Sequence, residues 1–378
     1  MTDQGAQSEQ HATRYPMDEE ALNVLLVGPL SPPIGGVSSH VERLAAVLAT
    51  NGIQCTVLDM YADDKKITVP GVSHKVCSMK GKVLPIIWLF FHMGLERCDA
   101  VHIHFSRSVG WFSIASVLLI KRRRRVILTL HHGDQAAVFR KSVWPIRVLA
   151  VGALRRMDKI VVLSSEQALF YQSVGVPTDR LVRWEVALPL NVTPDQALMP
   201  PEVQKLRPIE AGGEETILMT SGYPETYYGY EECVELLDRL SKYMPCKLVI
   251  SLYGTGTDRV YEHKLRTVLL HHPNVVLVGP MPSAGFLALL AKASVYLRPS
   301  KVDSYGLAIT DALNVGTPCL ASDVCNRDPR CETFPTGNKE AFMRQALKVV
   351  TRGRTLRVRP KLDQVDVAHF DYIEKCYR

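Results

Sequence analysis

The chain has 378 residues, of which 47% are hydrophobic and 22% charged, and it carries a net charge of +7. This composition is ordinary for a globular protein, so it excludes a wholly disordered chain, a collagen and a coiled coil. The length is too great for one ordinary core and predicts two domains. Nine cysteines without a CxxC pair or ligand-like spacing to histidines predict reduced thiols in a cytoplasmic protein.

The first predicted elements form a β-loop-α-β unit. Residues 1–20 are polar and are predicted to be a flexible arm, since they lack the apolar core of a secretory signal. A strand is expected at Asn23–Gly28, then a loop rich in Pro and Gly, then a helix whose apolar residues recur at helical spacing from Val37 to Leu48. Gly52 stands where a C-terminal cap is expected, and Ile53–Leu58 is the next predicted strand.

The alternation continues to a proline-rich boundary. Further strands are predicted at Ala100–Phe105, Val126–Leu130 and Lys159–Ser164, and helices at Val109–Ile120 and Trp144–Arg156. The irregular stretch from Pro189 to Gly213 contains five prolines at 189, 194, 200, 201 and 208, a composition that marks a domain boundary. Such units build parallel sheets through right-handed crossovers.

A second alternating series begins at Thr216. Its predicted strands are Thr216–Thr220, Lys247–Tyr253, Asn274–Val278, Val295–Leu297 and Pro318–Ala321, and its predicted helices are Tyr230–Tyr243, Asp258–His271, Ser283–Ala293, Tyr305–Val315 and Lys339–Thr351. The sequence therefore predicts an α/β protein with two Rossmann-like domains, 21–195 and 215–360, joined by a linker at 196–214 and facing each other across a cleft. An amphipathic segment within 361–378 is expected to pack back on the first domain.

A glycine-rich loop follows the first predicted strand and enters the first predicted helix. Gly35 and Gly36 have no Cβ, so a ligand can approach the backbone closely there. The free N–H groups and the helix dipole favour an anion such as a diphosphate. The loop is neither GxGxxG nor Walker A, which argues against a nicotinamide enzyme. A plain tight turn into the helix is the alternative.

Two histidines stand at the carboxyl end of a predicted strand. His131 and His132 follow Val126–Leu130, at the edge where open α/β sheets bind ligands. They are predicted to face the cleft and to donate to a sugar hydroxyl or a phosphate oxygen. An exposed imidazole at a capped strand end is the alternative. His102 and His104 lie within a strand pattern and are interpreted as mainly structural.

Two carboxylates flank the predicted start of a helix near Ser304. Asp303 and Asp311 are eight positions apart, about 2.2 helical turns, so they are not in contact and suit two ends of an elongated polar ligand. The alternative is that Asp303 or Ser304 merely caps the helix and that Asp311 is solvated. The backbone N–H groups predicted to face a phosphate are those of Tyr305, Gly306 and Leu307.

This combination resembles the retaining, nucleotide-sugar-dependent glycosyltransferases of family 4, which have the GT-B fold. Their C-terminal domain carries a Glu-x7-Glu element before a GxP turn, similar to Asp303-x7-Asp311 and Gly316-Thr317-Pro318 here. Their N-terminal domain carries a Gly-Gly loop like Gly35-Gly36 and a T-x-H strand end like Thr129-Leu130-His131. The block from Arg298 to Gly306 further resembles members that act in bacterial surface-polysaccharide assembly.

The resemblance implies a role for each matched residue. The donor substrate is a nucleoside-diphosphate sugar, and no metal or other cofactor is expected, because helix dipoles and N–H groups replace it. Asp303 and His131 are the implied catalytic residues, the first holding the sugar and phosphates and the second orienting the sugar. Asp311 is expected to bind the ribose hydroxyls. The acceptor attacks from the face that the diphosphate leaves, with retention of configuration.

This chain departs from the family pattern at the residues expected to bind the donor diphosphate. Both acidic positions are Asp, and the loop Ser221–Gly229 has no cation, where such enzymes usually carry an Arg and a Lys. A departing diphosphate needs compensating charge or preorganised N–H groups. Arg298, Lys301 or the helix termini are the candidates for that compensation.

The acceptor is expected to be a saccharide or a polyprenyl-linked saccharide. The basic run Lys121–Arg125 follows the apolar stretch Val109–Ile120, and Val83–Leu95 is also apolar, a combination that suits peripheral association with an anionic membrane. Helices buried over the sheet are the alternative. Neither stretch reaches the roughly 20 residues that span a bilayer. No nucleic-acid partner is expected, because the basic residues lack interleaved aromatics.

Two other functions are compatible with the same residues. The first is a nucleotide-sugar 2-epimerase on the same two-domain scaffold. The second is a non-catalytic, membrane-associated scaffold that has lost its diphosphate cations.

Overall fold

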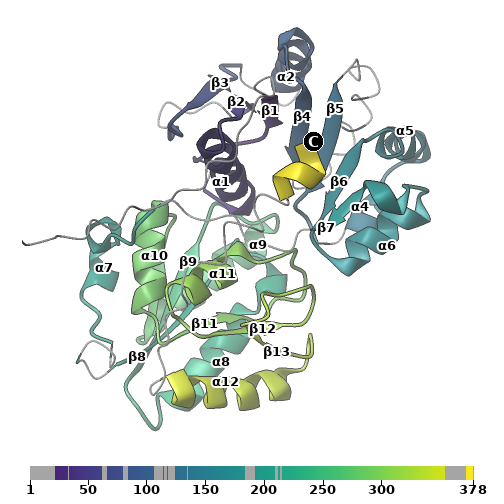
Figure 1. Cartoon of the computed structure of the whole chain (residues 1–378). Coiled ribbons are helices and arrows are strands. Elements are labelled where there is room, and N and C mark those ends of the chain that lie inside the picture. The colour runs from purple at the N-terminus through teal and green to yellow at the C-terminus, as the bar shows by residue number, and fades with distance from the viewer. Residues whose placement is uncertain are drawn as a thin grey trace, which may run out of the picture.

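The computed structural model describes residues 22–32, 34–61, 66–79, 84–105, 114, 117, 124–133, 135–183, 192–208, 212, 215–353 and 372–377. These residues form two α/β lobes, each built on its own parallel sheet, which confirms the predicted fold class (Figure 1). The predicted arm at 1–20 lies outside the described residues, as does the predicted helix Val109–Ile120 except for Ile114 and Val117.

The first lobe holds a seven-stranded sheet in the order β3-β2-β1-β4-β5-β6-β7, with every neighbouring pair parallel. The central strand β4 is buried along its whole length, as expected for a sheet covered on both faces. The strands are β1 Asn23–Val27, β2 Gln54–Asp59, β3 Val72–Val76, β4 Ala100–Phe105, β5 Arg125–Leu130, β6 Lys159–Val162 and β7 Leu181–Arg183.

Helices cover both faces of this sheet. The helices are α1 Gly36–Thr50, α2 Leu84–Leu95, α4 Gln135–Lys141, α5 Trp144–Leu154 and α6 Ser165–Ser173. Helix α1 contributes to one apolar core, and α2 and α5 contribute to the other. The helical turn at 372–377 joins the α1 core through Tyr372, Ile373, Cys376 and Tyr377. The Tyr377 hydroxyl also bonds the buried His102 ring, so the described end of the chain is anchored on the first lobe.

The second lobe holds a six-stranded parallel sheet in the order β10-β9-β8-β11-β12-β13. The strands are β8 Thr216–Gly222, β9 Cys246–Leu252, β10 Val275–Val278, β11 Val295–Arg298, β12 Cys319–Ser322 and β13 Glu332–Phe334. The helices are α8 Tyr230–Leu240, α9 Arg259–His271, α10 Ser283–Lys292, α11 Leu307–Asn314 and α12 Lys339–Gly353.

The predicted linker, 196–214, is largely packed against the second lobe. It contains the short helix α7, Pro201–Gln204, and the apolar side chains of Met199, Val203 and Leu206 are buried in the core of the second lobe. Burial of these three side chains therefore makes much of 196–214 part of the second lobe.

Two helix starts face the space between the lobes. Helix α1 follows Gly35, whose N–H donates to Ser38 Oγ at 3.0 Å. Helix α11 begins at Leu307, later than the predicted start near Ser304, because Gly306 has φ +77° and interrupts the helical backbone. That left-handed conformation is readily adopted by glycine and costs other residues energy. No helix among the described residues is both long enough and apolar enough to cross a membrane.

Candidate active site

A cavity of about 480 Å³ lies between the lobes, within the usual size range of ligand sites. Both helix starts open onto it, because Gly36 on one side and Gly306 on the other are among its lining residues. Nine of the predicted site residues line this cavity: Asp303, His131, Gly35, Gly36, Tyr305, Gly306, Leu307, His132 and Arg298. The structure thus brings together residues that are up to 272 positions apart in the chain.

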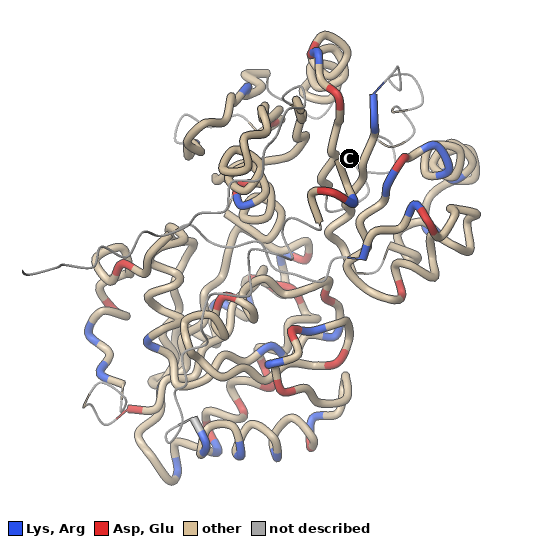
Figure 2. The backbone as a smooth tube through the Cα atoms, viewed as in Figure 1, with Lys and Arg blue, Asp and Glu red and all other residues tan. Residues whose placement is uncertain are grey.

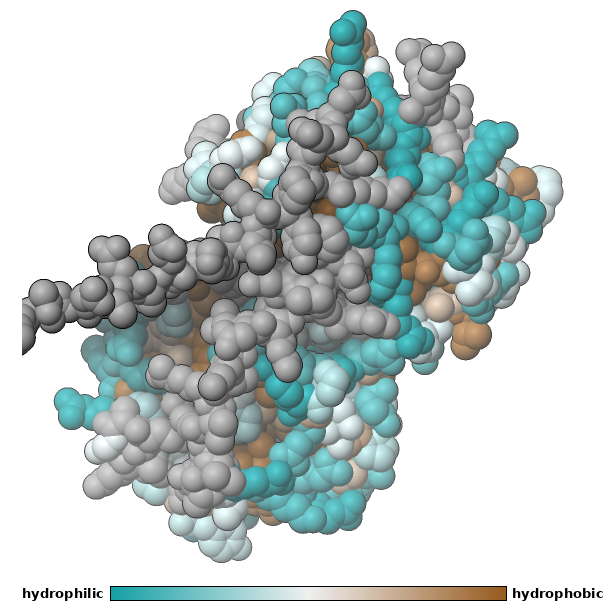
Figure 3. All heavy atoms as spheres, in the orientation of Figure 1, coloured by the Kyte–Doolittle hydropathy of each residue, from teal (hydrophilic) through white to brown (hydrophobic). Residues whose placement is uncertain are grey.

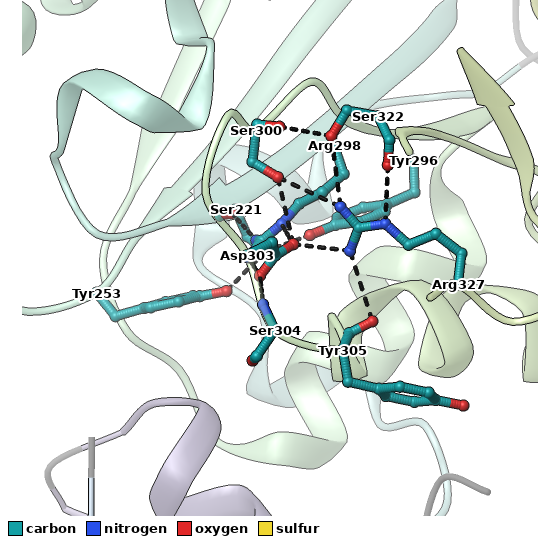
Figure 4. Close-up of polar contacts among 10 residues, drawn as sticks. All are labelled: Ser221, Tyr253, Tyr296, Arg298, Ser300, Asp303, Ser304, Tyr305, Ser322 and Arg327. Carbon is teal, nitrogen blue, oxygen red and sulfur yellow. Dashed lines mark hydrogen bonds and ion pairs between the residues drawn. The ribbon is translucent and has the colours of Figure 1, made fainter. Parts of the chain in front are cut away.

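Asp303 lies at the centre of a buried ionic cluster (Figure 4). Arg298, at the end of β11, donates Nε to Asp303 Oδ2 at 2.9 Å and Nη2 to Oδ1 at 3.0 Å. Arg327, in the loop after β12, donates Nη1 to Oδ2 at 2.8 Å. Ser300 Oγ and the Ser304 N–H supply the other two bonds, at 3.3 and 3.0 Å.

These contacts alter the interpretation of Asp303. A carboxylate has about four lone-pair positions, and five donors from the described residues already point at this one. In this structure its oxygens are therefore occupied by donors of the protein itself. That Asp303 holds the sugar hydroxyls and phosphates stays a prediction.

The cluster has a net positive charge. The two guanidinium groups hold the pKa of Asp303 well below its usual range despite burial, so the carboxylate is ionised. One anion between two cations leaves a charge of +1. Arg298 also donates Nη1 to the Ser221 carbonyl at 2.8 Å and lies 4.7 Å from the centre of the Tyr228 ring. Arg298 therefore reaches the cavity as part of a fixed assembly.

Asp311 and Lys301 are not among the residues that line the cavity. Arg43, on α1 of the first lobe, donates to both carboxylate oxygens of Asp311, at 2.9 and 2.7 Å. Asp311 therefore forms a buried ion pair between the lobes in this structure, and its contact with ribose stays a prediction. Lys301 is half-exposed, with its Nζ 3.6 Å from Glu232 Oε1, and its role at the diphosphate stays a prediction.

Four histidines of the first lobe form a contiguous group. His104 Nδ1 lies 3.2 Å from His131 Nε2, and the His40 ring lies 4.7 Å from the His131 ring between centres. His102 continues the group inward, with its ring 4.0 Å from that of His104. His104, interpreted from the sequence as mainly structural, lines the cavity together with His40, which no sequence motif indicated.

The imidazoles are held neutral. Burial lowers the pKa of His131 to about 3, and burial together with neighbouring histidines lowers the pKa values of His40, His102 and His104. A neutral imidazole can both donate and accept a hydrogen bond, as contact with a sugar hydroxyl requires. Neutral imidazoles also bind divalent metals, and ligand atoms of His40, His104 and His131 lie within 4.8 Å of one another.

The loop without cations supplies tyrosines instead. Tyr223, Tyr227 and Tyr228 line the cavity, and a Cβ on Gly35 would lie 2.5 Å from the Tyr223 hydroxyl. This loop of the second lobe therefore reaches the glycine turn of the first. Burial raises the pKa of Tyr223, so its hydroxyl stays protonated and available as a donor. The sequence shows the three tyrosines, but their position against Gly35 depends on how the lobes meet.

Comparison with known proteins finds a family match in each lobe. The model "Glycosyltransferase Family 4" matches residues 34–187, and the model "Glycosyl transferases group 1" matches residues 204–329. A phosphatidyl-myo-inositol mannosyltransferase of Mycobacterium leprae is 27% identical over 346 residues, which cover 86% of each chain.

Solved structures share the fold at low sequence identity. The catalytic domain of starch synthase IV from Arabidopsis thaliana, bound to ADP and acarbose, has a TM-score of 0.71 at 12% identity and covers 95% of this chain and 99% of its own. Alr3699/HepE from Anabaena, in complex with UDP and glucose, has a TM-score of 0.63 at 13% identity and covers 93% and 99%.

Proposed function

Because the chain belongs to glycosyltransferase family 4 and has the GT-B fold, we propose that it is a retaining, metal-independent enzyme. It moves a sugar from a nucleoside-diphosphate sugar to a saccharide or polyprenyl-linked acceptor. The proposed process is the biosynthesis of a cell-surface polysaccharide.

The observation that carries the proposal is the convergence of two helix starts on one cavity. The N-terminus of a helix presents free N–H groups and a partial positive charge, which favour phosphate. Gly36 opens α1 in one lobe and Gly306 precedes α11 in the other, and both line the cavity. A diphosphate held between them would be gripped by both lobes at once.

Two relatives support the substrate classes. Structures of Alr3699/HepE contain UDP and UDP-glucose, which supports a nucleotide sugar as the donor. The name of the Mycobacterium leprae relative, a phosphatidyl-myo-inositol mannosyltransferase, supports a hexosyl group and a lipid-linked acceptor.

If configuration is retained as proposed, the carboxylates of the cavity argue against a covalent intermediate. Its described acidic residues are Asp303 and Glu225, and a glycosyl-enzyme would need one of them as a nucleophile. Asp303 is saturated by five donors, and Glu225 accepts from the backbone N–H and the hydroxyl of Thr257. We therefore assign the attack to the acceptor hydroxyl itself, on the face that the diphosphate leaves. The bond from its oxygen to the anomeric carbon forms as the bond to the diphosphate breaks, and the hydroxyl proton passes to the departing phosphate oxygen. His131, neutral and facing the cavity, orients the transferred sugar.

An exposed apolar stripe on α2 supports attachment to a membrane. Leu84, Ile87, Phe91 and Leu95 recur on one side of this helix and are each more than half exposed. Trp144 at the start of α5 is 69% exposed, and Arg140 and Lys141 stand in the last turn of the preceding helix α4. Figure 2 shows further Lys or Arg positions on α5. Such a surface suits the apolar and anionic layers of a bilayer face.

Part of the basic run predicted to serve the membrane has another role. Arg124 donates to the carbonyls of Met93 and Gly94 and so caps the C-terminus of α2. Residues 121–123 lie outside the described chain. Apolar side chains reach the surface of the first lobe among hydrophilic ones (Figure 3). The apolar stripe, rather than the arginine run, is therefore the feature to test.

The test of attachment is sedimentation with vesicles that contain anionic lipid. The double variant Ile87→Glu/Phe91→Glu is expected to remain in solution, while the wild type sediments. Tyr243, 85% exposed on the second lobe, gives the control Tyr243→Glu, which is expected to sediment like the wild type. Equal sedimentation of all three proteins would refute attachment through α2.

The test of function is a panel of nucleotide sugars, followed by NMR of the anomeric centre of the product. Transfer or slow hydrolysis with one donor, in the presence of a chelator and with retained configuration, is expected. Release of an epimerised sugar without acceptor would favour the 2-epimerase. Absence of binding to every nucleoside diphosphate would favour the non-catalytic scaffold.

A further inference from the structure

The diphosphate of the proposed donor carries two negative charges into a cavity that the loop 221–229 does not neutralise. Helix termini supply only partial charges, of about half a unit each. A full positive charge near the diphosphate would lower the energy of the departing group further, most effectively if it were fixed before the reaction. The question is which groups of this chain provide it.

We propose that the cluster of Arg298, Asp303 and Arg327, with its net charge of +1, compensates the diphosphate in place of the missing loop cations, and that Arg327 is its positioning residue. This inference rests on the proposed function, since it assumes that a nucleoside diphosphate occupies the cavity. Arg298 lines the cavity, whereas Arg327 does not and acts through its neighbours.

Arg327 lies directly beneath the start of α11. A Cβ on Gly306 would meet Arg327 Nη1 at 2.8 Å, and the same nitrogen is 3.5 Å from the Tyr305 carbonyl. Its Nε donates to the Ser322 carbonyl at 3.0 Å, and the side chain is 2% exposed. The charge of Arg327 therefore adds to the positive end of α11, at a depth where salt screens it little.

Asp303 lowers the energy of this arrangement. Two buried guanidinium groups side by side would repel each other without an anion between them. The carboxylate accepts from both, and it also receives the Ser304 N–H in the loop that leads to Gly306. The acidic residue thus ties the cations to the phosphate-binding turn and does not need to touch the ligand.

A purely structural role predicts a different result from an electrostatic one. If the cluster only stabilised the loop, loss of Arg327 and loss of the Asp303 charge would weaken diphosphate binding alike. If its net charge matters, the two changes act in opposite directions, because Arg327→Met lowers the charge from +1 to 0 and Asp303→Asn raises it to +2.

The experiment is calorimetric titration of the full chain with UDP, GDP, ADP and inorganic pyrophosphate. Arg327→Met is expected to weaken binding of the preferred nucleotide and of pyrophosphate roughly 10- to 100-fold, given the Coulomb energy of one charge at several ångströms. Arg327→Lys keeps the charge and is expected to stay within about threefold of the wild type. Asp303→Asn is expected to bind at least as tightly as the wild type.

Arg330 provides the matched control, since it lies three positions along the same loop and pairs with Asp328 at 2.7 Å. Arg330→Met is expected to leave affinity within about twofold. Should Asp303→Asn not fold, the double variant Asp303→Asn/Arg327→Met restores the net charge of +1 and is expected to bind more tightly than Arg327→Met. Equal weakening of ligand binding by Arg327→Met and by Asp303→Asn would overturn the inference. A wild type that binds none of the four ligands would overturn the proposed function as well.

Discussion

The ion pair between Arg43 and Asp311 joins the two lobes, and its removal gives the sharpest prediction about stability. The side chains are 5% and 7% exposed, and Arg43 Nη1 and Nη2 donate to the two carboxylate oxygens, at 2.9 and 2.7 Å. Removing one partner of a buried pair leaves the other charge unpaired, at a cost of about 3–5 kcal/mol. Replacing both by apolar groups of similar volume is often neutral.

We therefore expect Arg43→Met to destabilise the protein by about 3 kcal/mol or more, unless the lobes separate and let water reach Asp311. The double variant Arg43→Met/Asp311→Leu is expected to lie within about 1 kcal/mol of the wild type. Urea denaturation followed by tryptophan fluorescence reports the first lobe, because all four tryptophans, 88, 111, 144 and 184, precede the boundary. Small-angle scattering reports separation of the lobes as an increase in radius of gyration.

The two measurements together decide the outcome. A single variant that matches the wild type in both midpoint and radius of gyration would contradict the reasoning, because it would mean that the pair neither stabilises the lobes nor holds them closed. A double variant as unstable as the single one would contradict it too, since the cost would then come from lost packing.

Three further predictions concern the cavity. Acidification from pH 7 to 4.5 should lower the melting temperature, because the pKa of His131 falls from its ordinary 6.5 to about 3 on folding. The unfolded chain therefore binds more protons in that window, and stability rises with pH. A melting temperature that does not change with pH, or a slope unchanged in His131→Asn, would contradict this. Gly133→Ala should abolish transfer, because its Cβ would overlap the Asp303 carbonyl across the cleft. Gly36→Ala has nothing within 4 Å of its Cβ, so it should keep the wild-type melting temperature and raise only the donor KM. Wild-type kinetics in both variants would mean that the two glycines are not part of the site. Exhaustive chelation should leave the transfer rate unchanged, and a rate restored only by zinc would assign the His40, His104 and His131 group to a metal.

The alternation of strands and helices could be predicted because apolar runs and their punctuation are local signals. Strand β4 was expected at Ala100–Phe105 and is found there. The edge strands β3, β7 and β13 were not anticipated, since they are three to five residues long and only partly buried. The start of α11 was expected too early, because the positive φ of Gly306 depends on the turn around it.

The residues at the cavity could be predicted where a motif follows a strand or opens a helix, as with His131, Gly36 and Asp303. Their partners could not, because these come from distant parts of the chain. Arg43 and Asp311 are separated by 268 positions, and Arg327 lies 24 positions beyond Asp303. Sequence position identifies Asp303 as a candidate, while only its five donors show that it holds two arginine side chains together.

A crystal structure with the preferred nucleoside diphosphate bound tests the central claim most directly. The phosphates are predicted to lie between the starts of α1 and α11, within hydrogen-bonding distance of the backbone N–H groups near Gly306 and close to Gly36. A diphosphate bound elsewhere, away from both helix starts, would contradict the account.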